Sequence, residues 1–315
     1  MLNVCGCPKL GDLKYDPPGT YISRAGLKSL NVRFRRAVRW DWNVCDISEA
    51  TTMDNFIDND GKPVFSPPGA FHADHCLQGP LDDFVTNTNW FSSKYGINYG
   101  QMETIGILGA QRDRAPCTPA NSLHCMGKAL DIAWITWNGG VHSRPCNGPD
   151  EANDLTSLRR LVAIEAGLRK RFGFVLNRYI GNIDPEKGSV TEGAKSPHRN
   201  HFHIEVGCGL GLRVDRTRLD DPVLSANRHK RSSHYFLQDC VRAFTDVQPD
   251  YDAYWGRQAE LGYRTLLSDL GMELLDPIGT LSHFQLFLSY VMMHGFANRR
   301  AGAYRWGGTV SLAGV

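Results

Sequence analysis

The 315-residue chain has neither a long apolar run nor a strong excess of charge. Its most apolar segment, 284–293, contains Gln285 and Ser289 and is too short for a membrane-spanning helix, which needs about 20 apolar residues. The formal net charge of +2 does not favour nucleic-acid binding, which depends on neutralising phosphate charges. We therefore expect no integral membrane segment and no nucleic-acid partner.

The chain also lacks the signatures of several other protein classes. Residues 1–8 have no basic start and no apolar run, so no secretory signal peptide is visible. The acidic run 58–60 does not have the ligand spacing of a calcium loop. The glycines at 207, 209 and 211 lack the strand-then-helix setting of a nucleotide-binding loop. These patterns predict neither a calcium site nor a nucleotide site.

Two short segments instead combine residue types that bind metal ions. The first, 122–131, reads Ser-Leu-His-Cys-Met-Gly-Lys-Ala-Leu-Asp and contains His124 and Asp131. Apolar and β-favouring residues over 128–135 predict a buried strand, with Asp131 projecting from one face. His124 is then expected in the loop entering that strand, where Gly127 lets the backbone turn so that both side chains reach one ion.

The second segment, 198–205, reads His-Arg-Asn-His-Phe-His-Ile-Glu. Polar and apolar residues alternate over 201–206, which predicts a strand with His201, His203 and Glu205 on one face. One of the two histidines can bind a metal while the other faces the reacting group. Glu205 has two interpretations, an orienting partner of His201 or His203 and a solvated residue at the end of the strand.

Each of these residues, taken alone, has an ordinary structural explanation as a hydrogen-bonded histidine or a carboxylate bound by backbone amides. Taken together they favour a metal site, because an ionised carboxylate in an apolar strand is costly to bury without a cation. His124, Asp131 and His203 offer nitrogen and carboxylate ligands. Such a set of three is typical of a catalytic Zn²⁺ whose fourth position is open to water or substrate.

The two segments also carry a family resemblance. The pattern Ser-x-His-x-x-Gly-x-Ala-x-Asp at 122–131, followed by His-x-x-His-Phe-His at 198–203, resembles the extensin-like C-terminal domain family. That family is related to the D-Ala-D-Ala carboxypeptidases, the penicillin-insensitive murein endopeptidase and the Hedgehog domain. Segments 105–114 and 172–176 are similar to flanking parts of the family, so the likeness covers about residues 80–208.

The resemblance implies a role for five histidine and aspartate side chains. His124, Asp131 and His203 match the Zn²⁺ ligands of the family. His201 matches the general base or electrostatic partner of the metal-bound water. His198 resembles a further active-site histidine of the murein endopeptidase branch.

The resemblance also implies a site for a substrate carboxylate. Arg114 matches the arginine that holds this group in the family, and Arg112 is the alternative. Asp113 stands where extensin-like domains commonly have a cysteine, so the family disulfide at this position is not expected.

The implied activity is zinc-dependent hydrolysis of peptide bonds in bacterial peptidoglycan stem peptides or cross-links, by a carboxypeptidase or an endopeptidase. The implied partners are peptidoglycan peptides. Two alternatives stay open: an exported antibacterial toxin or phage lysin with the same chemistry, and a non-catalytic zinc-containing module that binds the cell wall.

Nine cysteines favour an extracytoplasmic location, periplasmic or secreted, which the family resemblance also implies. An odd number leaves at least one thiol unpaired. Cys117 and Cys125 flank the loop that carries His124, where a disulfide would fix it, although the sequence gives no connectivity. The alternative is that several cysteines are small buried residues.

We expect an α+β fold with a mainly antiparallel central sheet, flanking helices that hold the zinc site and a C-terminal helical unit. The expected segments are a loop-rich N-terminal segment at 1–75, the extensin-like zinc peptidase domain at 76–212, a linker at 213–232, a three-helix unit at 233–297 and a flexible tail at 298–315.

Helical periodicity predicts four helices in the second half of the chain. One spans 153–172, capped by Asn153 or Asp154, and three more lie near 233–246, 254–271 and 279–295. The turn 252–257 distantly resembles peptidoglycan-binding modules. A plain helical cap is the alternative explanation for these last three helices.

Overall fold

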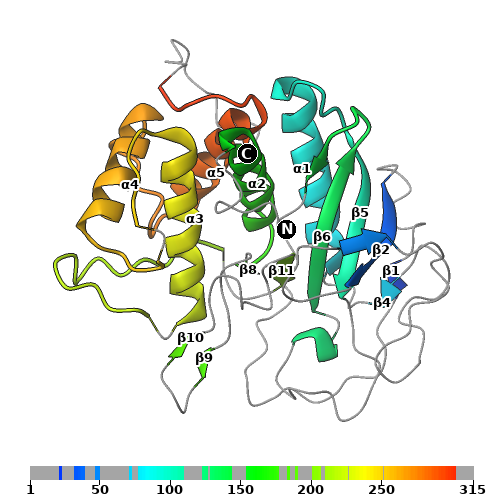
Figure 1. Cartoon of the computed structure of the whole chain (residues 1–315), viewed down its shortest axis with the longest axis horizontal. Coiled ribbons are helices and arrows are strands. Elements are labelled where there is room, and N and C mark those ends of the chain that lie inside the picture. Colours follow the sequence, from blue (N-terminus) through cyan, green and yellow to red (C-terminus); the bar gives the residue numbers. More distant parts are fainter. Residues whose placement is uncertain are drawn as a thin grey trace. The chain divides into compact units, whose positions relative to one another are not determined.

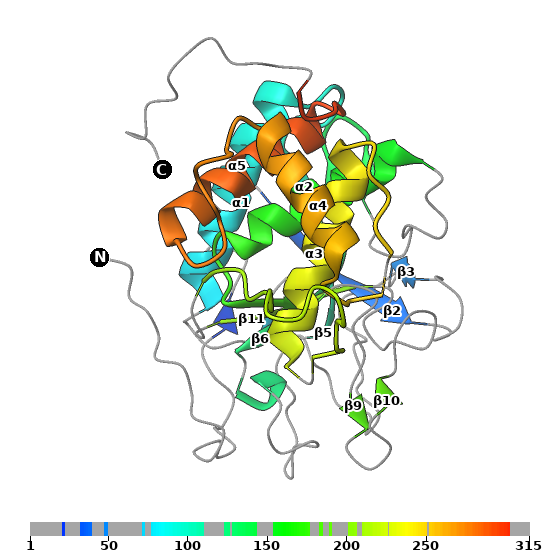
Figure 2. The same ribbon diagram turned by 90° about the vertical axis from the view of Figure 1, so that its left-hand side faces the viewer.

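The computed structural model describes residues 21–22, 32–39, 47–49, 71–72, 77–109, 123–126, 128–143, 154–176, 183–184, 189–190, 201–206, 210–225, 227–250 and 252–302 (Figures 1 and 2). The chain divides into two compact units. The first comprises 1–90, 98–146 and 171–209, and the second comprises 91–97, 147–170 and 210–315. Among the helices that the structure describes, none has the length and apolar character needed to cross a bilayer.

The first unit is built on a seven-stranded sheet in the order β3-β2-β5-β6-β11-β8, with β7 paired to β6. Figure 1 labels β2, β5, β6, β11 and β8 of this sheet. Its strands are β2 (Arg33–Arg39), β3 (Ile47–Glu49), β5 (Met102–Gly109), β6 (Ala129–Trp137), β7 (His142–Ser143), β8 (Phe174–Leu176) and β11 (Phe202–Glu205). Within this sheet only β2 and β5 run parallel. The expected α+β fold with a mainly antiparallel central sheet is therefore confirmed.

Two short antiparallel pairs stand apart from this sheet. β1 (Tyr21–Ile22) pairs with β4 (Phe71–His72), and β9 (Ile183–Asp184) pairs with β10 (Ser189–Val190).

Strand β6 lies in the middle of the sheet because most of its side chains on both faces are apolar. Leu130, Ile132 and Ala133 have no exposed surface. Trp134 lies over Gly106 of β5, where an added Cβ would meet ring atoms at 2.3 Å. This close packing fixes the strand that carries Asp131, as the apolar run 128–135 predicts.

Helix α1 (Gln78–Tyr95) is an element that the sequence pattern does not predict. Its threonine, asparagine and serine residues are weak helix formers, which masks its apolar face. Pro80 lies in the first turn, where a missing N–H group is tolerated. Asn89 Oδ1 accepts a hydrogen bond from Met102 N at 2.7 Å and so joins this helix to β5. Tertiary contacts thus outweigh a poor local propensity. The fully buried side chains of α1 are Leu81, Phe84, Val85, Thr88 and Ser92.

The second unit contains the predicted helices of the second half of the chain. They are α2 (Leu155–Arg169), α3 (Arg228–Phe244), α4 (Arg257–Asp269) and α5 (Leu281–Phe296). Helix α2 packs against α3 and α5. Gly295 allows the close approach of α5, because a Cβ there would meet the carbonyl oxygen of Arg159 at 2.5 Å.

Capping residues set where two of these helices begin. Asp154 Oδ1 accepts from Thr156 N at 2.9 Å, so Asp154 is the cap of α2. Asn227 Oδ1 accepts from the backbone N–H groups of His229 and Lys230. Helix α3 consequently begins at Arg228, inside the segment 213–232 that the sequence predicts as a linker.

Candidate metal centre

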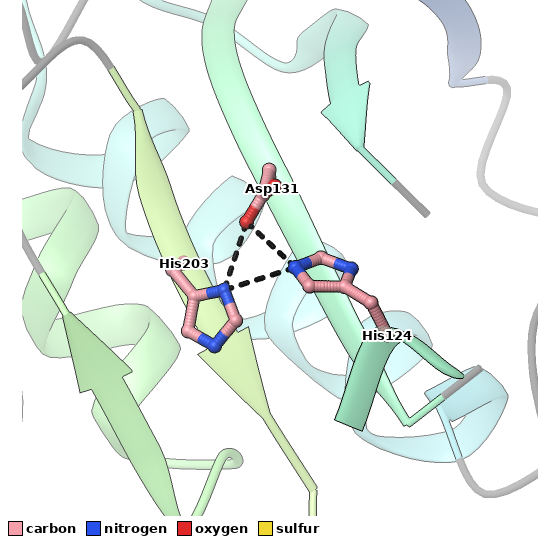
Figure 3. A group of neighbouring side chains, drawn as sticks. All are labelled: His124, Asp131 and His203. Carbon is pink, nitrogen blue, oxygen red and sulfur yellow. Dashed lines mark hydrogen bonds and ion pairs between the residues drawn. The ribbon is translucent and has the colours of Figure 1, made fainter. Parts of the chain in front are cut away.

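Three side chains from separate elements of the first unit converge on one point (Figure 3). Asp131 projects from β6, and His203 lies directly opposite it on the antiparallel strand β11. His124 comes from a 3₁₀ helix, Leu123–Met126, which precedes β6. A hydrogen bond from Lys128 N to Leu123 O at 2.9 Å closes this turn and brings His124 back to the strand.

The ligand atoms form a compact triangle. His124 Nε2 lies 3.3 Å from Asp131 Oδ1 and 3.2 Å from His203 Nδ1, and His203 Nδ1 lies 2.9 Å from Asp131 Oδ1. Tetrahedral bonds of about 2.0–2.1 Å place ligand atoms about 3.3 Å apart. The three residues therefore fit the ligand spacing of a small divalent ion, and the cluster could hold a metal.

The cluster is largely screened from solvent. His124 and His203 are buried, and the Asp131 side chain is 15% exposed. Burial strengthens the electrostatic interaction of the carboxylate with a cation, because fewer water molecules screen it.

His201 lies beside the three ligand atoms and is not a member of their group. Its Nε2 atom is 3.5 Å from Asp131 Oδ1, and the residue is 4% exposed. The two histidines of the His-x-His pair therefore differ in position, since His203 lies on β11 and His201 directly precedes that strand. His203 belongs to the ligand triangle and His201 flanks it.

Glu205 contacts the far side of the His203 ring. His203 Nε2 donates to Glu205 Oε1 at 2.8 Å. Of the two interpretations of Glu205 that the sequence allows, the structure favours the orienting partner of His203 over the solvated strand end. The sequence feature that indicates this contact is the two-residue spacing of His203 and Glu205, which puts both side chains on one face of β11.

The charges within the cluster change the pKa values of two groups. Burial raises the pKa of the Asp131 carboxyl. The nearby His124 and His201 and the hydrogen bonds from His124 and His203 lower this pKa by more than burial raises it, so it lies well below its ordinary value. Burial lowers the pKa of His203, but its bonds to Asp131 and Glu205 outweigh this and raise it to about 9. In the metal-free protein the carboxylate is therefore ionised and His203 is protonated at neutral pH.

Several predicted residues lie outside the described part of the chain. These are the candidate catalytic residues His198 and Arg114, together with Arg112 and Asp113. Of the cysteine side chains, the structure describes that of Cys240, which is a buried free thiol. Cys117 and the side chain of Cys125 lie outside the described residues, so the suggestion that a disulfide fixes the loop of His124 is not tested.

Comparisons of the whole chain with protein-family models, with curated proteins and with solved structures found no match. The resemblance to extensin-like domains therefore stays a prediction from the two motifs. The geometry of the His124, Asp131 and His203 cluster is independent of that resemblance.

Proposed function

We propose that the first unit is a zinc-dependent peptidase that hydrolyses peptide bonds of bacterial peptidoglycan stem peptides or cross-links. The observation that carries the proposal is the triangle of His124 Nε2, Asp131 Oδ1 and His203 Nδ1. Structural zinc sites usually have four protein ligands, often cysteines, whereas catalytic sites have three and leave one position open. The three-residue set and its nitrogen and oxygen donors agree with the catalytic class.

Zinc held by these residues would lower the pKa of a bound water toward neutrality and polarise the scissile carbonyl group. The distance of 3.5 Å between His201 Nε2 and the ligand atom Asp131 Oδ1 supports a role for His201 in proton transfer. In this proposal His201 Nε2 accepts a proton from the attacking water and returns it to the leaving amine. Imidazole suits both steps, since its ordinary pKa lies near neutral pH.

The substrate class rests on the two motifs at 122–131 and 198–203. Peptidoglycan stems carry free carboxylates, and a guanidinium group binds a carboxylate through paired hydrogen bonds. We assign this role to Arg114, with Arg112 as the alternative, and a supporting role in the site to His198. An extracytoplasmic location, which nine cysteines favour, suits a wall substrate.

The test is a mass-resolved digest of purified sacculi with the zinc-loaded full chain. We expect new peptide fragments, their loss on adding a chelator and their return on adding zinc. A His201→Ala variant that still binds zinc should leave the sacculi intact. Unchanged muropeptide profiles with the zinc-loaded wild type would contradict hydrolysis, and binding to sacculi without cleavage would favour a wall-binding module.

A further inference from the structure

Both ring nitrogens of His203 face a carboxylate. Nδ1 lies 2.9 Å from Asp131 Oδ1 on the side of the ligand triangle, and Nε2 lies 2.8 Å from Glu205 Oε1 on the opposite side. The two side chains are largely buried, with 8% of His203 and 17% of Glu205 exposed. The contact with Glu205 is therefore short and mostly protected from competing water.

The sheet explains how Glu205 reaches this position. Residues 203 and 205 lie on one face of β11, so their side chains are neighbours along the strand. The partner of Glu205 on β6 is Ala129, while the partner of His203 is Asp131. The small side chain of Ala129 leaves room for Glu205 to lean along the strand toward the His203 ring.

We infer that Glu205 is the positioning residue of the metal centre and fixes His203 in the tautomer that binds metal. A neutral imidazole carries one proton. To offer Nδ1 to a cation, His203 must keep that proton on Nε2. Asp131 favours the opposite tautomer because its carboxylate accepts from Nδ1, and Glu205 opposes this by accepting from Nε2.

The inference rests on the proposed zinc site for its ligand, but it concerns binding and not hydrolysis. A carboxylate behind a ligating histidine fixes the ring orientation and increases its basicity. Removal of such a partner typically weakens metal binding about 10–100-fold. Glu205→Gln keeps the size of the side chain and an acceptor oxygen but removes the negative charge, so we expect a loss of zinc affinity in that range.

The matched control is Glu273→Gln. This is the same chemical change at an exposed residue of the second unit, where Glu273 accepts from Ser268 Oγ. Zinc affinity is measured by competition with a chromogenic chelator, and the thermal midpoint of each metal-free variant shows whether it folds. The control should bind zinc as tightly as the wild type.

A second measurement needs no variant. Two-bond ¹H–¹⁵N correlation spectra of the zinc-loaded wild type report which nitrogen of each histidine carries a proton. We expect His203 to be protonated at Nε2, with Nδ1 bound to zinc. Protonation at Nδ1, or a zinc affinity of Glu205→Gln within about twofold of the wild type, would overturn the positioning role even if the variant folds normally.

These readouts separate the inference from the proposed function. Weaker zinc binding in Glu205→Gln together with an inactive wild type would retain the role of Glu205 and reject the peptidase. Hydrolysis by the wild type together with unchanged zinc binding in Glu205→Gln would retain the peptidase and reject the role of Glu205. A wild type that binds no zinc would reject both.

Discussion

Each unit contains a buried carboxylate surrounded by nitrogen atoms, but the nitrogens differ in kind. In the first unit Asp131 Oδ1 lies within 2.9–3.5 Å of imidazole nitrogens of His124, His201 and His203. In the second unit Glu260 accepts from Arg216 Nε and Trp255 Nε1 through Oε2.

The difference decides what each carboxylate can do. Guanidinium and indole nitrogens carry hydrogen at neutral pH and have no lone pair to offer, so the Glu260 cluster can only hold the non-helical residues Arg216 and Trp255 against helix α4. Imidazole loses a proton near neutral pH and then offers a lone pair to a metal ion. The same burial of a carboxylate therefore yields a structural ion-pair network in one unit and a candidate metal centre in the other.

The strongest test of this contrast removes one ligand. His203→Ala leaves His124 and Asp131 as the remaining members of the ligand group. We expect zinc affinity to fall by more than the roughly 100-fold upper range for outer partners of a ligand. Calorimetric titration measures this loss. His283→Ala, which changes a histidine of α5 in the second unit, should leave zinc binding intact.

The next largest effect should separate binding from turnover at the same site. His201→Ala removes the histidine outside the ligand triangle, so we expect zinc affinity within about threefold of the wild type and a fall in kcat of about 10²–10⁴-fold, the usual contribution of a general base. Paired measurements of bound zinc and of fragment release from sacculi check this. Equal losses of zinc and activity would instead make His201 a ligand.

Zinc affinity should depend on pH because His203 has to lose a proton to bind. With the pKa of His203 raised to about 9 in the metal-free protein, we expect affinity to rise about tenfold per pH unit from pH 7 and to level off near pH 9. Asp131 adds no dependence in this window, since its pKa lies well below its ordinary value. Competition titrations at fixed ionic strength measure the slope.

Over the same pH range in which zinc affinity rises, the stability of the metal-free protein should fall. A group whose pKa is raised on folding stabilises the native state below its unfolded pKa, near 6.5 for histidine. This contribution of His203 is complete below about pH 6.5 and is lost as the pH rises through about 9. Thermal unfolding measures this effect. If the thermal midpoint falls over that pH window in the wild type and stays constant in His203→Ala, His203 is the group responsible for the pH dependence.

The smallest expected effect concerns the second unit. Glu260→Gln weakens the interaction with Arg216 but keeps an acceptor for Trp255 Nε1, so we expect a loss of about 1–3 kcal/mol in the free energy of unfolding. Denaturant unfolding of the full chain measures it. Zinc affinity should not change, and a parallel loss of zinc would show that the two carboxylate clusters are coupled.

The sequence predicts the strands that carry the metal centre because their patterns are local. The apolar run around Asp131 and the alternation over 201–206 indicate β6 and β11 directly. The pairing of Asp131 with His203 and of Ala129 with Glu205 is not local, since it depends on the register between the two strands. For this reason the sequence leaves the role of Glu205 open.

Helix α1 and strand β2 are among the elements that the sequence does not predict, for related reasons. Helix α1 consists largely of weak helix formers, and its stability comes from packing of residues such as Phe84 and from the contact of Asn89 with β5. Strand β2 lies in a segment whose prolines and glycines indicate loops, and it forms by parallel pairing with the distant strand β5. Neither interaction is visible in a short stretch of sequence.

Zinc K-edge X-ray absorption on the full chain loaded with one equivalent of zinc is the most direct test of the metal centre. We expect nitrogen and oxygen neighbours alone at about 2.0–2.1 Å, including two imidazole rings, and their partial loss in His203→Ala. Sulfur neighbours at about 2.3 Å would assign the ion to cysteines, and failure to retain one zinc per chain would equally contradict a site built from His124, Asp131 and His203.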